Sequence, residues 1–251
     1  MSRTVKLVLD LVIGAGVPIV VLAFLSEPLG AVPAYLLSAL IPVGWVAIDL
    51  LFLTRRFNII TSYTGFLALV RGLLAFWFVD GWQFALKDTA SGMAACLVLA
   101  GSVISRRPLM SLFWHQAVQP DTPERDATFT ALMAQAPVRQ SLVVGTLLVL
   151  AVMVVSSGLN IILNLAIVTA PFGTTLFNQQ VAQVNAITRV ALNAIELLGY
   201  GGAFWLLFRA LSAVLSKHLD EGVASDDDFW QAADAWSRKA EASVGDGQQM
   251  T

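Results

Sequence analysis

Charged residues are scarce in this chain of 251 residues, since they make up 13% of it while hydrophobic residues make up 57%. A soluble globular domain has about 25% charged residues, so the composition argues against an ordinary water-soluble fold. The apolar residues fall in runs of about 20, the length with which a helix crosses a hydrocarbon core of roughly 30 Å. The sequence therefore predicts an all-α protein, a polytopic helix bundle in a lipid bilayer.

Cysteine and histidine are nearly absent. The single cysteine, Cys96, excludes an internal disulfide and a thiolate metal cluster. The two histidines, His115 and His218, are expected at the cytoplasmic edge of the bilayer, where a lone histidine is usually solvated. No HExxH, GxSxG, CxxC or phosphate-binding glycine loop occurs. We therefore predict no catalytic residues, no metal and no cofactor, and a protein that is not an enzyme.

Basic clusters are missing too, and the net charge of −2 gives no indication of a nucleic-acid partner. What the sequence does contain is a series of apolar segments. We predict six transmembrane helices, at 5–25, 31–53, 58–79, 88–105, 139–168 and 186–216. They form a transmembrane domain over 1–219, with a cytoplasmic loop at 106–138, and residues 220–251 form a cytoplasmic tail.

The basic residues predict the orientation of this domain. Most of the 15 Lys and Arg residues fall on one side of an alternating six-span arrangement, which the positive-inside rule makes the cytoplasmic side. The opposite side holds Lys87 alone, and the loop at 169–185 has no charge. The sequence therefore predicts a multi-pass membrane protein with both termini in the cytoplasm.

Two shorter helices are predicted outside the bilayer. Residues 122–136 form an amphipathic helix in the cytoplasmic loop, with Thr122 as its N-cap and an apolar face that includes Phe129 and Leu132. The tail contains a soluble helix, SDDDFWQAADAWSRKAEA, with acidic residues first and basic residues last. Its exposed aromatic residues need cover, either from the protein itself or from a partner; these candidates are Phe229, Trp230 and Trp236.

Polar residues recur on one face of the last span. Asn185, Arg189, Asn193, Glu196 and Tyr200 are spaced by three or four residues, as in a helical stripe. The fifth span carries a similar stripe of Ser156, Asn160 and Asn164. Arg189 is expected to reach the outer interface.

The third span carries Arg71, which by helical rise lies about 13 Å below the outer surface, at the same depth as Glu196. A charge buried alone at that depth costs about 2.5–3.5 kcal/mol. We therefore predict a buried Arg71–Glu196 ion pair, whose remaining donors and acceptors are satisfied by amides. These amides are Asn160, Asn164 and Asn193.

A second polar set is predicted near the cytoplasmic side, where it would form interfacial ion pairs. Its members are Asp10, Asp49, Arg55, Arg56, Arg106, Arg107 and Arg209.

The buried polar layer has two interpretations. Ionisable residues inside a membrane often mark a pathway for a solute or a proton. Prolines and glycines in the first two spans, such as Pro18 and Pro42, would supply the kinks of a transport cavity. Alternatively, a neutralised pair with amides fixes the register of a bundle. Both interpretations remain open on sequence grounds.

The segment KDTASGMAACLVLAGSVISRRPLMSLF resembles part of the bacterial intracellular septation protein A family and its six-span relatives. In that family a membrane helix ends in Gly-Ser, a short run, two basic residues and Pro-Leu. The matching residues here are Gly101, Ser102, Arg106, Arg107, Pro108 and Leu109. Similarity also extends to Lys6 and Asp10 in VKLVLDL, to Gly158 and Asn160 in SSGLN, and to Asn185.

This resemblance implies an inner-membrane protein linked to cell division or envelope assembly, with no catalytic residues. The leading expectation is therefore a non-catalytic scaffold or interaction protein of the cell envelope. Its partners would be the lipid bilayer and other membrane proteins. The alternative is a small-solute or proton-coupled transporter or channel that uses the Arg71–Glu196 layer.

Overall fold

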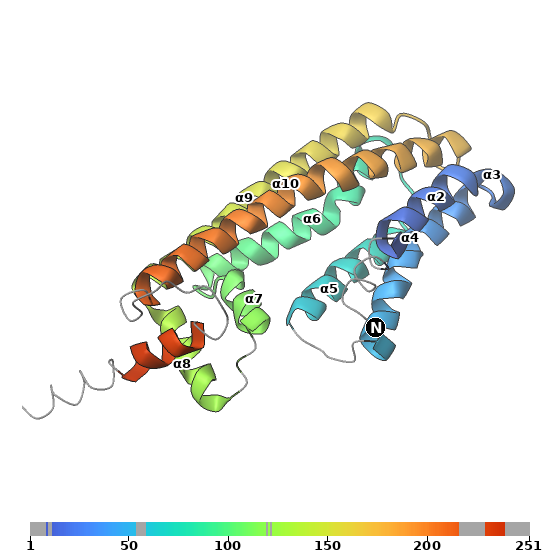
Figure 1. Ribbon diagram of the computed structural model, residues 1–251. Coiled ribbons are helices and arrows are strands. Elements are labelled where there is room, and N and C mark those ends of the chain that lie inside the picture. The colour runs from blue at the N-terminus through green and yellow to red at the C-terminus, as the bar shows by residue number, and fades with distance from the viewer. Residues whose placement is uncertain are drawn as a thin grey trace, which may run out of the picture. The chain divides into compact units, whose positions relative to one another are not determined.

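The computed structural model describes residues 9, 12–53, 59–118, 120, 122–215 and 229–238. Within these ranges the chain is helical apart from turns and short connections, and it contains no strand (Figure 1). The all-α prediction is therefore confirmed for this part of the chain. The contacts divide the protein into two units, which we call unit 1 (1–100 and 150–198) and unit 2 (101–149 and 199–251).

Four helices are long and apolar enough to cross a membrane. They are α4 (Ala31–Ile48), α6 (Gly81–Ile104), α9 (Ala136–Ile167) and α10 (Thr175–Leu215), and they contain 18, 24, 32 and 41 residues. Large apolar side chains point outward from these helices: Leu97, Ile104 and Leu198 are 74%, 82% and 77% exposed. Such surfaces are costly in water and suit lipid.

The first and third predicted spans correspond to shorter helices. The first contains a π-helical turn, η1 (Val12–Gly16), followed by α2 (Val17–Phe24). The third corresponds to α5 (Ile59–Leu74), which ends five residues before the predicted end of that span at 79. Six full spans are therefore not established by helix length within the described residues. A short helix, α3 (Ser26–Leu29), follows α2, and a second π-helical turn, η2 (Asp49–Leu53), follows α4.

Two predicted helix boundaries are wrong. Both lie at the end of unit 1 that carries residues 168–174. The uncharged loop predicted at 169–185 is helical from Thr175, where the Thr174 hydroxyl accepts a hydrogen bond from the Phe177 amide at 3.1 Å. Helix α6 likewise begins at Gly81 rather than at 88. In both cases the helix continues through polar residues beyond its apolar part. A prediction from a continuous apolar run therefore places the start of the helix too late in the sequence.

The core of unit 1 is rich in aromatic residues near that end. Tyr35 of α4, Phe84 of α6 and Phe177 of α10 are all buried there. The ring centroids of Phe84 and Phe177 lie 5.0 Å apart, and those of Tyr35 and Phe177 lie 6.1 Å apart. Edge-to-face and tilted contacts at these separations stabilise the packing beyond the apolar area that they bury. Segments far apart in the sequence are held together in this way.

Unit 2 contains α7 (Leu109–Val118), α8 (Pro123–Ala134), the adjoining parts of α9 and α10, and a helical segment at 229–238. Helix α7 was not predicted. Helix α8 lies where the sequence predicts a short helix, and the Thr122 hydroxyl caps it by accepting a hydrogen bond from the Arg125 amide at 3.2 Å. In this unit α9 approaches α10 closely, since a Cβ atom at Gly145 would lie 3.3 Å from that of Ala203.

Candidate functional site

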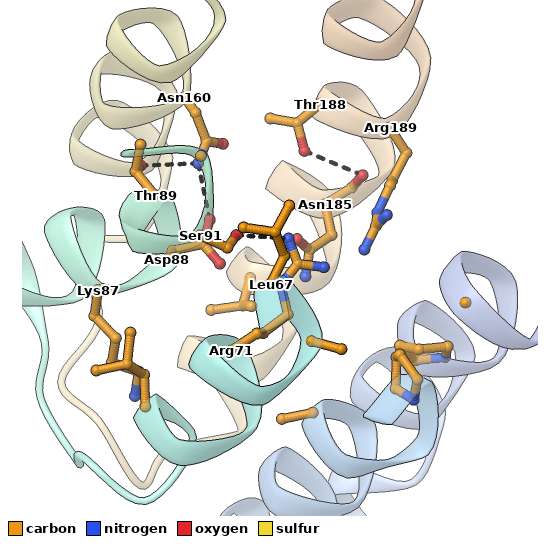
Figure 2. A pocket seen from close by; sticks show the side chains of 18 of the residues that line it. Leu67, Arg71, Lys87, Asp88, Thr89, Ser91, Asn160, Asn185, Thr188 and Arg189 are labelled. Carbon is orange, nitrogen blue, oxygen red and sulfur yellow. Dashed lines mark hydrogen bonds between the residues drawn. The ribbon is translucent and has the colours of Figure 1, made fainter. Parts of the chain in front are cut away.

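A cavity of about 520 Å³ lies within unit 1, between residues of α2, α4, α5, α6, α9 and α10. Its lining is unusually polar for helices of this apolar composition. Five charged side chains line it: Arg71, Lys87, Asp88, Arg189 and Glu196. Uncharged polar side chains line it as well, among them Ser91, Ser156, Asn160, Asn185 and Asn193. Figure 2 shows several of these side chains converging from different helices.

Asp88 of α6 is held by two amides of α9. One oxygen of its carboxylate accepts hydrogen bonds from the Nδ2 atoms of Asn160 and Asn164, each at 3.1 Å. Asn160 also donates to the Thr89 hydroxyl at 3.0 Å (Figure 2). Asn164 is 2% exposed. The two asparagines are four residues apart, so one face of α9 presents both amides. Hydrogen bonds to an ionised group are among the stronger contacts in a protein, and these join α6 to α9.

Lys87 is enclosed by aromatic rings. Its side chain is 6% exposed and its ammonium donates to the carbonyl oxygen of Trp77. The ammonium also lies 4.8 Å from the ring centroid of Tyr35 and 5.8 Å from that of Phe84. The negative faces of aromatic rings attract a cation at this range, which compensates part of its lost hydration.

The two arginines of the cavity belong to α5 and α10. The Arg71 guanidinium donates to the Ser91 hydroxyl at 3.2 Å (Figure 2). Arg189 is partly buried and lines the cavity together with Arg71, Asp88 and Glu196. Its predicted extension to the outer interface stays a prediction. Its spacing of four residues from Asn185 and from Asn193 places it on the face of α10 that lines the cavity.

Sequence reasoning placed five residues in one buried polar layer. Four of them, Arg71, Asn160, Asn193 and Glu196, line the same cavity. Asn164 joins them through the carboxylate of Asp88.

The contacts within the layer differ from those predicted. The described residues include no ion pair between Arg71 and Glu196, and Arg71 bonds to Ser91 instead. Glu196 lines the cavity together with Arg189 of the same helix. The amides of Asn160 and Asn164 bind Asp88 rather than an Arg71–Glu196 pair, because α6 presents its own carboxylate to that face of α9.

Sequence reasoning missed Lys87 and Asp88 as site residues. Lys87 was assigned to the outer side and Asp88 to the first position of the fourth span, because that span was expected to begin at 88. The signal that would have found them is the helical continuation of α6 back to Gly81, which places both residues two turns inside the helix.

The predicted cytoplasmic-side set is only partly described. Asp10, Arg55 and Arg56 lie outside the described residues. Asp49 begins the π-helical turn η2. Arg106 and Arg107 lie in the turn after α6, where Arg106 has a φ of 59° and the Arg107 amide donates to the Ser102 carbonyl at 2.9 Å. The Arg209 guanidinium lies 5.6 Å from the ring centroid of Trp205.

The aromatic residues of the tail pack within unit 2. Trp230 is 7% exposed and belongs to a core with Phe129 and Leu132 of α8 and Leu215 of α10. The Arg125 guanidinium lies 4.9 Å from its ring centroid. Phe229 and Trp236 pack against the same core and are partly buried. The protein itself therefore covers the face that was a candidate for partner binding.

Comparison of the sequence with protein-family models and with curated proteins, and of the fold with solved structures, gave no match. Among the described residues, no group of three His, Cys, Asp or Glu side chains is arranged to hold a metal ion.

Proposed function

We propose that the protein is a multi-pass membrane protein that passes a small polar solute through the cavity of unit 1. The observation that carries this proposal is the presence of five charged side chains around one cavity, between helices whose outer surfaces suit lipid. A cavity of about 520 Å³ falls within the range of roughly 300–1,000 Å³ that is typical of small-molecule sites.

The alternative of a purely structural layer is less well supported. A buried pair that only fixes the register of a bundle is expected to be closely packed, because protein interiors contain few voids larger than a water molecule. Here Arg71 and Asn193 are exposed side chains that face a cavity. A polar cavity of this size is suited to water, which lowers the cost of carrying charge within the membrane.

The proposed topology has six spans with both termini in the cytoplasm of a bacterial cell. The four long helices supply four crossings, and the apolar helices Val12–Phe24 and Gly65–Leu74 supply the cores of the other two. The positive-inside distribution of Lys and Arg supports this orientation. No catalytic step is part of the proposal.

Thiol labelling tests whether the cavity is open to water. In a Cys96→Ser background, which removes the only native cysteine, Asn193→Cys is placed in the cavity and Leu198→Cys on the outer face of the same helix. A membrane-impermeant methanethiosulfonate reagent is then added to intact membranes. We expect labelling of Asn193→Cys only, because the reactive thiolate forms in water and not in lipid.

Equal labelling rates at the two positions, or no labelling of Asn193→Cys until the membrane is dissolved, would contradict a water-filled pathway. Both cysteines must react in detergent, which establishes that neither is inaccessible for other reasons.

A second candidate function follows from the resemblance to the septation protein A family, namely an interaction protein of the cell envelope. Residues 101–109, which carry part of the resemblance, include a defined turn in unit 2. The Ser102 hydroxyl accepts a hydrogen bond from the Leu109 amide at 3.1 Å, and the Ser102 carbonyl accepts one from the Arg107 amide at 2.9 Å. This turn exposes Arg106 and Arg107, which supports a charged docking site for a partner.

A further inference from the structure

We infer that the solute is a small oxyanion, bound through its carboxylate or phosphate group by the guanidinium groups of Arg71 and Arg189. This inference rests on the proposed function and specifies the class of solute that the cavity accepts. The first supporting observation is the net charge of the side chains that line the cavity. Three cationic side chains and two carboxylates line the cavity within the described part of the chain, so a monoanion would bring the site to neutrality.

The other charged groups differ in how far they are engaged by the protein. The Lys87 ammonium is held by a backbone carbonyl and two aromatic rings. The Asp88 carboxylate accepts hydrogen bonds from two amides. These two groups therefore have partners that account for much of their hydrogen-bonding capacity.

The arginines are less fully engaged. A guanidinium has five N–H donors in a planar fork. Arg71 uses one of its nitrogens to bond to Ser91. Arg189 makes no hydrogen bond to any residue in the described ranges, although it lines the same cavity as Arg71 and both carboxylates. Two guanidinium forks thus reach one cavity from α5 and α10 (Figure 2).

Two like-charged arginines on one cavity favour an anionic ligand. Arg71 and Arg189 both line the cavity. Neither forms an ion pair within 4.0 Å with Asp88 or Glu196, as far as the described residues extend. An oxyanion between the two forks would relieve the repulsion and accept paired N–H donors, the geometry in which arginine binds carboxylates and phosphates most strongly.

Ser156 provides an independent indication of a ligand. It lines the same cavity, is 3% exposed, and its hydroxyl has no hydrogen-bond partner among the residues described. A buried hydroxyl without a partner is costly, and an oxygen of the bound anion would accept its proton.

Calorimetric titration of the full-length protein in lipid nanodiscs tests this inference. The probes are sodium lactate and sodium phosphate, with choline chloride as the cationic control. We expect saturable binding of at least one anion and none of choline. Binding of lactate alone identifies a carboxylate site, and binding of phosphate alone identifies a phosphate site.

The variants Arg71→Gln and Arg189→Gln are each expected to raise the Kd roughly tenfold or more, because each removes a charge-assisted bond. Arg71→Lys keeps the charge but loses the planar fork, so it is expected to weaken binding as well. Arg209→Gln removes an arginine of unit 2 and is expected to leave the Kd unchanged.

Binding of choline, failure of both anions to bind the wild-type protein, or an unchanged Kd in Arg189→Gln would overturn the inference. If an arginine variant elutes as an aggregate, Ser156→Ala replaces it, and a Kd equal to that of the wild type counts against the site. If neither anion binds but Asn193→Cys is labelled, the proposed pathway stands and its solute belongs to another class. Absence of that labelling removes the pathway itself.

Discussion

At the scale of single residues, the cavity is organised by a carboxylate that is held by amides. Asp88 on α6 accepts from Asn160 and Asn164 on α9, so one acidic side chain positions two polar residues of a neighbouring helix. Each of these hydrogen bonds involves an ionised group, and such bonds contribute about 1.5–3 kcal/mol. The same carboxylate forms no ion pair with Arg71 or Arg189 within the described residues, and both arginines line the cavity.

Because the Asn164 amide donates a hydrogen bond to the Asp88 carboxylate, the effects of substituting the two residues on the free energy of unfolding should not be additive. We expect Asn164→Leu alone to lower the free energy of unfolding by about 1.5–3 kcal/mol, since a buried donor to the carboxylate is lost. In an Asp88→Asn background, Asn164→Leu should lower the free energy of unfolding by a smaller amount. The difference between the two effects should be about 0.5–3 kcal/mol, the usual coupling energy between residues in contact. Thermal unfolding of the four proteins in detergent gives the coupling energy.

Leu165→Ala, one position along α9, is a suitable control because Leu165 is 47% exposed and hydrogen-bonds to no side chain in the described ranges. Its effect should add to that of Asp88→Asn. Additivity at Asn164 as well would mean that the amide and the carboxylate act independently.

At the scale of helices, unit 2 depends on small residues where α9 meets α10. A Cβ atom at Gly145 would lie 3.3 Å from the Cβ of Ala203 and 3.6 Å from its backbone. Ala203 belongs to the Gly199–Ala203 pair in which the sequence indicates close helix contact. Small residues allow backbones to approach in lipid, where the hydrophobic effect does not drive helices together.

A larger side chain at Gly145 is therefore expected to push α9 and α10 apart in unit 2. We predict that Gly145→Leu destabilises the protein by about 1–3 kcal/mol, the usual cost of overpacking. Gly158→Leu is the matched control on the same helix, because a Cβ atom there has nothing within 4 Å. It should be neutral or stabilising, since leucine favours a helix more than glycine does. Equal melting temperatures for the two variants, measured in detergent, would rule out close packing at Gly145.

The ends of the helices show what sequence patterns miss. Hydropathy locates the apolar middle of α10 but not its first turns, which contain Asn178 and Gln180. Those residues remain helical because tertiary contacts satisfy their side chains. Asn178 donates to the Ser26 hydroxyl at 2.8 Å and to the Ala31 carbonyl at 2.7 Å, and Gln180 accepts from the amides of Thr169 and Ala170. These partners come from other segments, so no local pattern reveals them.

At the scale of the whole protein, periodicity predicted which residues share a face, but not which of them meet. The stripe of Asn185, Arg189, Asn193 and Glu196 does line one cavity, as the 3.6-residue repeat implies. Equal depth suggested that Arg71 would bond to Glu196. Depth along the bilayer leaves the rotation of each helix undetermined, and α5 directs the Arg71 guanidinium to Ser91 of α6.

The cavity residues and the tail aromatics belong to different parts of the chain. Every residue that lines the cavity lies at or before Glu196, whereas the tail aromatics pack with α8 and the end of α10 in unit 2. Removal of residues 220–251 is therefore expected to leave the labelling rate of Asn193→Cys unchanged. It uncovers Phe129 and Leu132, both 0% exposed in the intact protein, and an uncovered apolar patch favours non-specific association.

If the protein also acts as an envelope interaction protein through its tail, the same truncation abolishes partner recovery in an affinity pull-down from cross-linked membranes. Trp230→Ala separates that role from a general loss of the tail, because it removes only the side chain that packs against α8, including Arg125 of that helix. Partner recovery that survives both changes would exclude the tail as a docking element. Slower labelling of Asn193→Cys in the truncated protein would instead mean that the cavity depends on the tail, contrary to a pathway confined to unit 1.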